Sequence, residues 1–168
     1  MEIFEKLIIP ITGILVSILL AYLTAKAVNK SELNNGKVLI LEIIKRYVIN
    51  VHNNFDKNAK IKTNLIDRKY YLSELEAINT DIKELFTNPL LIKTFKTHSG
   101  LTMLTINLRR EIVYLKQTDS TPGIRTDTLK SFIDLFDAIK SEFKDKDFSR
   151  DSNLNEITQI IAFLRKLI

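Results

Sequence analysis

The hydrophobic pattern of the chain begins with one long uninterrupted run. No charged residue occurs from Leu7 to Ala25, and the run is bounded by Lys6 and Lys26. At about 1.5 Å per residue, a helix of this length spans roughly 28 Å, which is close to the hydrocarbon thickness of a bilayer. The pattern predicts a single transmembrane helix, and we assign residues 1–30 to an N-terminal membrane anchor with a juxtamembrane extension.

A cleaved signal peptide is the alternative interpretation of this run. Ala25-Lys26-Ala27 resembles a small-x-small cleavage site, but Glu2 and Glu5 do not fit the positively charged region that a signal peptide needs. The anchor is therefore the favoured interpretation.

Basic residues are more numerous after the predicted span, where Lys26, Lys30 and Lys37 stand, than before it, where Lys6 stands alone. By the positive-inside rule, this bias predicts a single-pass protein of the inner (cytoplasmic) membrane whose C-terminal part lies in the cytoplasm. The same residues are predicted to contact the headgroups of the lipid bilayer, and they are Lys26, Lys30, Lys37, Lys45 and Arg46.

Small residues recur every four positions within the predicted span, at Gly13, Ser17, Ala21 and Ala25. A ridge of this kind lets membrane helices approach each other closely. It predicts a homo-oligomer that forms through the transmembrane helix.

A turn signal, Asn34-Asn35-Gly36, follows the anchor and is expected to end its helix. The next segment, from Val38 to Val51, is apolar around most of its circumference, with a narrow polar stripe at Glu42, Lys45, Arg46 and Asn53. Such a helix is typical of the centre of a bundle, and the alternative is a helix that lies on the inner leaflet.

Four later segments show the heptad-like spacing of helices that pack around a shared core. The sequence therefore predicts an all-α fold, in which residues 37–168 form a soluble antiparallel bundle of about five helices with a charged linker at 144–153. The predicted core positions are Tyr71, Leu75, Ile78, Ile82 and Leu85; Leu101, Leu104, Leu108, Ile112 and Leu115; Leu129, Phe132, Phe136, Ile139 and Phe143; and Leu154, Ile157, Ile161, Leu164 and Ile168.

The composition restricts the chemistry of this fold. The 168 residues include no Cys and only two His, so thiolate metal sites and cysteine nucleophiles are excluded. Asp134 and Asp137 share a helix side with Lys130, which is typical of a solvated face, and Glu111 follows two arginines and reads as surface charge. We expect no catalytic residues, no metal and no cofactor. Nucleic acid is not an expected partner, because most basic residues are interleaved with acidic ones.

One short motif points to an enzyme. The segment from Arg46 to His52 resembles the Arg-x5-His motif of HEPN-type ribonucleases, which are helical bundles. The resemblance covers seven residues, and it implies that Arg46 holds an RNA phosphate while His52 assists acid–base chemistry at a cleft between paired protomers. The structural interpretation of the same residues places Arg46 towards headgroups and His52 at the end of a helix.

These observations favour a membrane-tethered, non-enzymatic helical interaction or regulatory module that faces the cytoplasm and binds a cytoplasmic protein. The first alternative is a self-associating membrane effector that perturbs the bilayer, similar in layout to small effectors of bacterial antiphage systems. The second alternative is the HEPN-like ribonuclease.

Overall fold

The computed structural model describes residues 2–62, 64–87, 98–118, 121–142 and 152–167, with the side chains of 2–15, 33–34, 98–99, 142 and 152–153 left out. The described part is helical and contains no β-strand, apart from two isolated bridges between loop residues. The elements are α1 (Glu2–Asn54), α2 (Leu65–Leu85), α4 (His98–Gln117), α5 (Thr126–Glu142), α7 (Ser152–Leu164) and the short 3₁₀ helix η1 (Arg165–Leu167).

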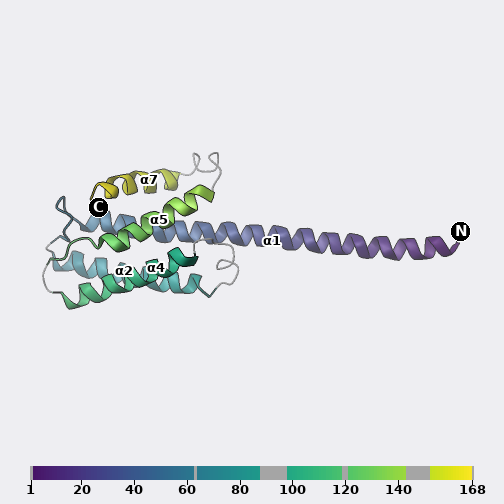
Figure 1. Cartoon of the computed structure of the whole chain (residues 1–168), viewed down its shortest axis with the longest axis horizontal. Helices are drawn as coiled ribbons and strands as arrows, with labels where there is room; N and C mark the ends of the chain where they lie inside the picture. The colour runs from purple at the N-terminus through teal and green to yellow at the C-terminus, as the bar shows by residue number, and fades with distance from the viewer. Residues whose placement is uncertain (1, 63, 88–97, 119–120, 143–151, 168) are drawn as a thin grey trace.

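Helix α1 is the axis of the molecule. Its C-terminal half packs against α2, α5 and α7, while α4 bridges α2 and α5 on the far side. The N-terminal half projects away from the bundle as a single helix, so the two chain ends lie at opposite ends of the long axis (Figure 1). The all-α bundle of about five helices predicted from the sequence is confirmed.

The apolar positions that the sequence predicts for the core are the ones that the bundle buries. Every predicted position on α2 is buried, and the same holds on α4, α5 and α7 for each predicted position whose side chain is described. Phe143, Ile168, the segment from Leu90 to Thr97 and most of the predicted linker at 144–153 lie outside the described residues. The segment from Val38 to Val51 contributes the central stripe, which confirms that its apolar side is covered by the bundle; the buried side chains there are Ile40, Leu41, Ile43, Ile44, Tyr47, Val48 and Val51.

One helix replaces the two that were expected at the N-terminal end. The prediction that Asn34-Asn35-Gly36 stops the first helix is wrong, because α1 continues through these residues without a break. A single glycine or asparagine in a helix costs only about 1 kcal/mol or less. Packing overrides that cost, since Gly36, Lys37 and Ile40 are already buried against the bundle.

The prediction of a membrane-spanning anchor is also overturned. Among the described residues, none of the helices combines the length and the apolar composition needed to cross a bilayer. The assignment to the inner membrane as a single-pass protein is therefore wrong.

The loop after α1 fixes the end of this helix. Asp56 Oδ1 accepts hydrogen bonds from the backbone N–H groups of Asn58 and Lys60, at 2.7 and 3.2 Å. The loop then bridges to the turn before α5, where the Ile124 N–H donates to the Ala59 carbonyl at 3.0 Å. Ala59 takes a left-handed conformation with φ of 57°. The C-terminal end of α1 is thus held by the bundle while its N-terminal half projects.

Candidate functional site

An uncovered strip of side chains runs along one side of α1, from the projecting half into the bundle. Two exposed pairs show its direction along the helix, Leu20 with Ala21 and Val38 with Leu39. Five turns of α-helix take about 18 residues, so Leu20 and Val38 lie on the same side of the helix, as do Ala21 and Leu39. We call this strip the open face, and its exposed members are Ser17, Leu20, Ala21, Thr24, Val28, Ser31, Asn35, Val38 and Leu39.

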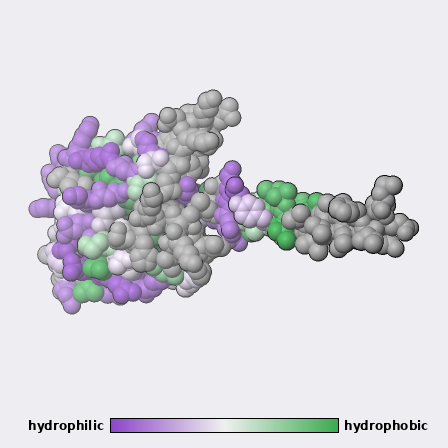
Figure 2. Space-filling model, turned by 45° about the vertical axis from the view of Figure 1, so that its right-hand side comes forward, coloured by the Kyte–Doolittle hydropathy of each residue, from purple (hydrophilic) through white to green (hydrophobic). Residues whose placement is uncertain are grey.

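The projecting half is apolar at its surface. Figure 2 shows a hydrophobic patch on the projecting helix next to a hydrophilic band that separates it from the bundle. The large side chains exposed in this stretch are Val16, Ile18, Leu19, Leu20, Tyr22, Leu23 and Val28. Contiguous apolar patches of more than a few hundred Å² mark interaction sites on soluble proteins.

Two basic residues on the projecting half, Lys26 and Lys30, lie on the side away from the open face. Nine residues make about two and a half turns, which places Lys26 opposite Ser17 and Lys30 opposite Ala21. The members of the open face carry no charge, and the exposed Glu32 borders the face beside Ala21 and Leu39. It therefore differs in chemistry from the back of the same helix.

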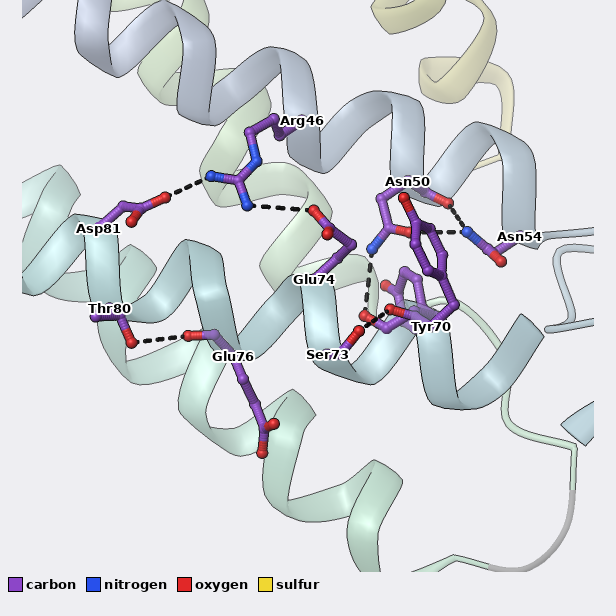
Figure 3. A network of polar contacts seen from close by, with 10 residues as sticks. Arg46, Asn50, Asn54, Tyr70, Ser73, Glu74, Glu76, Thr80 and Asp81 are labelled. Carbon is purple, nitrogen blue, oxygen red and sulfur yellow. Dashed lines mark hydrogen bonds and ion pairs between the residues drawn. The ribbon is translucent and has the colours of Figure 1, made fainter. Parts of the chain in front are cut away.

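A polar groove continues the open face where α1 runs beside α2. Arg46 of α1 reaches across to α2, where its Nη1 lies 2.5 Å from Asp81 Oδ2 and its Nη2 lies 3.2 Å from Glu74 Oε2 (Figure 3). Deeper in the groove, Asn54 Nδ2 donates to the Asn50 carbonyl at 2.8 Å. The groove encloses about 190 Å³ and is lined by Glu42, Lys45, Arg46, Ile49, Asn50, Asn53, Asn54, Tyr70 and Glu74.

The small-residue ridge predicted from the sequence overlaps the open face. Ser17 and Ala21 belong to the open face, and Ala25 is exposed beside it. Gly13 lies in the stretch 2–15, for which the structure describes only the backbone. The three described members of the ridge therefore lie together on the surface of the projecting helix.

The five basic residues predicted to contact headgroups do not share one surface. Lys26 and Lys30 are exposed on the projecting half, whereas Lys37 is only 9% exposed. Lys45 lies 3.4 Å from Glu156 of α7, and Arg46 is paired with α2. The bundle thus uses part of this set for its own packing.

Arg46 and His52, the pair of the ribonuclease motif, point to different helices. Arg46 binds carboxylates of α2, while the His52 ring meets the Phe163 ring of α7 edge-on, with centroids 5.3 Å apart. His52 also lines an apolar cavity of about 240 Å³ between the ends of α1 and α7. Within one chain the two side chains do not converge on a common site.

A buried polar cluster lies between α1, α2, α4 and α5. Glu111 of α4 is only 1% exposed, which contradicts its interpretation as surface charge. Tyr71 Oη donates to Glu111 Oε1 at 2.6 Å, while Glu111 Oε2 and the Tyr47 hydroxyl have no hydrogen-bond partner within the described part of the chain. Burial raises the pKa of Glu111 from 4.5 to about 7, although the Tyr71 hydrogen bond acts in the opposite direction.

The helical spacing of the sequence indicates that Glu111 is buried, although the charged residues next to it suggest a surface position. Glu111 lies three positions after Leu108 and four before Leu115, and both leucines belong to the apolar stripe of α4. Residues three and four apart share a helix face, so periodicity places Glu111 beside the core. The neighbouring arginines, Arg109 and Arg110, are exposed.

Metal-ligating side chains do not gather in the described ranges, where no group of three or more His, Asp or Glu residues is placed to hold an ion. Asp134 and Asp137 are exposed on α5, and Asp137 pairs with Arg165.

Comparison of this chain with protein-family models, with curated proteins and with solved structures found no match.

Proposed function

We propose that this chain is a non-enzymatic helical interaction module, in which the bundle holds α1 and displays its open face to a protein partner. The observation that carries the proposal is the continuity of the open face from Leu20 and Ala21 to Val38 and Leu39. Such a surface offers a straight track of apolar and small polar side chains to a partner helix, and laying an amphipathic helix into a complementary groove or strip is a recurrent mode of recognition.

Binding, rather than catalysis, agrees with the inventory of side chains near this surface. The groove beside α2 contains carboxylates, amides and basic groups, and its strongest contacts are the ion pairs of Arg46 with Glu74 and Asp81. These groups hold two helices together. Covalent catalysis needs a nucleophile with an adjacent general base. The described side chains that line the groove include no such pair.

Site-specific photocrosslinking in cells tests the proposal. A benzoylphenyl side chain at Val28 probes the open face, and the same group at Val113 of α4 is a matched control, because these valines are 49% and 51% exposed. We expect a discrete protein adduct from position 28 and none from position 113. Equal adduct patterns from both positions, or none from position 28, would refute the proposal.

The ribonuclease alternative has its own test. It requires Arg46 and His52 to act at one cleft, and its support is limited to the spacing of the motif. Incubation of the purified chain and its His52→Ala variant with labelled RNA decides between the ribonuclease and the interaction module. If the parent cleaves the RNA and the variant does not, the ribonuclease is correct and our proposal is refuted.

A further inference from the structure

An apolar cavity lies where α1, α7 and η1 end, at the end of the bundle that is far from the projecting half (Figure 1). It encloses about 240 Å³, and most of its wall is apolar, formed by Val51, Phe55, Phe163, Leu164 and Leu167. Val51 and Leu164 are fully buried, whereas His52 and Phe163 are exposed. The cavity therefore has an apolar floor and opens to solvent beside the His52 and Phe163 rings.

The walls of this cavity are held by contacts between helices. The His52 ring of α1 meets the Phe163 ring of α7 edge-on, with centroids 5.3 Å apart. Phe55 meets Tyr71 of α2 in the same manner, also at 5.3 Å. Edge-to-face aromatic contacts of this kind stabilise the positions of both rings. The cavity is therefore formed before a ligand enters, which lowers the entropy cost of binding.

Lysines surround the opening of the cavity. Lys57 belongs to its wall and forms no ion pair among the described side chains. Asp56 also belongs to the wall, but its Oδ1 accepts hydrogen bonds from backbone N–H groups of its own loop. It is the only acid in residues 55–62 and η1, the two segments at this end that also carry the exposed Lys60, Lys62 and Lys166. This excess of positive charge favours an anionic group at the opening.

The C-terminal end of α1 carries partial negative charge on its last carbonyl groups, which would repel an anion if they were free. Two of these carbonyl groups are occupied by one residue of the following loop. Lys62 Nζ donates to the Asn53 carbonyl at 2.6 Å, and the Lys62 N–H donates to the Asn54 carbonyl at 3.0 Å. The end of the helix therefore does not cancel the attraction of Lys57 for an anion.

The volume of the cavity limits the size of its ligand. A protein cavity of roughly 150 Å³ takes one benzene molecule. On the same scale, the 240 Å³ available here takes about ten non-hydrogen atoms. A carboxylate with an unbranched chain of about eight carbons has this size, whereas a phospholipid with two long acyl chains greatly exceeds it.

We propose that this cavity binds a small amphipathic carboxylate of the class of medium-chain fatty acids. The alkyl chain lies against Val51 and Leu164, and the carboxylate lies at the opening beside Lys57. A largely apolar cavity with a few polar groups at its edge is the usual form of a small-molecule site. The site lies at the C-terminal end of α1 and is separate from the open face, so this inference goes beyond the proposed function.

Titration of the isotope-labelled full chain with sodium octanoate, followed by amide chemical shifts at constant ionic strength, measures the binding. We expect a dissociation constant of about 0.1–1 mM, as for a ligand of about ten non-hydrogen atoms. The largest shifts should occur at Val51, His52 and Leu164. No saturable shift up to about 10 mM octanoate, or shifts largest on the projecting half of α1, would overturn the inference.

The length of the alkyl chain separates binding in the cavity from adsorption to exposed apolar side chains. Octanoate should bind about tenfold more tightly than hexanoate, because each buried methylene is worth about fourfold in the dissociation constant. Dodecanoate should bind no more tightly than octanoate, because the cavity is already full. A steady gain in affinity through dodecanoate would instead indicate adsorption and would overturn the inference.

The charge of the ligand has its own test. Octylammonium has the same alkyl chain with the opposite charge, and it should bind at least about threefold more weakly than octanoate. Lys57→Gln should weaken octanoate binding about two- to fivefold, whereas Lys83→Gln, at an exposed position on α2, should leave it unchanged. Equal affinities for the two ligands, or equal effects of the two substitutions, would refute the assignment of a carboxylate.

Filling the cavity tests its location directly. Leu167→Trp places a larger side chain at the wall and should weaken octanoate binding at least about tenfold. Ile106→Trp, at an exposed position on α4, is the matched control and should bind octanoate as the parent does. Circular dichroism verifies that both variants are folded. Octanoate binding that survives in folded Leu167→Trp would overturn the inference, and it would leave the proposed function of the open face untouched.

Discussion

Replacing Glu111 with glutamine removes one ionisable group from the core and leaves its shape almost unchanged. Glu111 Oε1 accepts a hydrogen bond from Tyr71 Oη, while Oε2 is buried without a partner among the described residues. A neutral acid tolerates this environment, whereas a carboxylate loses its hydration there and keeps few compensating contacts. The folded state therefore holds the proton of Glu111 more tightly than the unfolded state does.

The size of the effect follows from the shift in pKa. Burial raises the pKa of Glu111 from 4.5 to about 7, and this difference of about 2.5 units corresponds to about 3 kcal/mol at roughly 1.4 kcal/mol per unit. Because the pKa is raised on folding, the unfolded chain releases the proton first as the pH rises. The associated stability is fully present below about pH 4.5, falls between pH 4.5 and 7, and is lost above about pH 7.

Urea unfolding followed by circular dichroism measures this pH-dependent contribution of Glu111 to the free energy of unfolding. The free energy of unfolding of Glu111→Gln, minus that of the parent, should be about 2–3 kcal/mol larger at pH 8 than at pH 5. All other titrating groups are common to both proteins and cancel in the difference. Glu84→Gln, at an exposed position on α2, serves as the control and should show no such pH dependence. The reasoning is refuted if the difference for Glu111→Gln is the same at both pH values.

Three further substitutions test the packing that supports α1, each by its urea midpoint. Arg46→Gln removes two half-exposed ion pairs with α2 and should cost about 1 kcal/mol; an unchanged midpoint would show that these pairs contribute nothing. Phe132→Ala empties a fully buried position and should cost about 3–5 kcal/mol, and a loss below about 1 kcal/mol would contradict the assigned core. Ala59→Gly relieves a left-handed alanine and should stabilise the chain by about 0.5–1 kcal/mol, whereas destabilisation would argue against that loop conformation.

The core of the bundle could be predicted from spacing because each helix faces the core with one stripe. On α2, for instance, the five predicted positions are the five buried residues. Apolar side chains at helical spacing have one low-energy place, against the other helices, so the periodic signal and the packing agree. The segment from Val38 to Val51 followed the same rule, with its polar stripe left open to solvent or to neighbouring polar groups.

The remaining features depended on contacts that a local pattern does not contain. Asn34-Asn35-Gly36 has the composition of a helix stop, but burial that begins at Gly36 extends the helix through it. The burial of Glu111 depends on α1, α2 and α5 surrounding α4, and its neighbours in sequence, Arg109 and Arg110, suggested the opposite. The open face was missed because it joins two segments that the sequence assigned to different domains.

The continuity of α1 also explains how an apolar helix can project without a partner. Starting a helix costs free energy because several residues must be ordered before the first hydrogen bond forms, whereas extending an existing helix adds one hydrogen bond for each residue ordered. The buried stretch from Ile40 to Val51 supplies the nucleus, so the projecting half extends a helix that is already formed. The open face is therefore ordered before a partner arrives, and binding does not include the entropy loss of forming the helix. An isolated peptide of the projecting residues lacks this nucleus, and we expect it to compete poorly for the same partner.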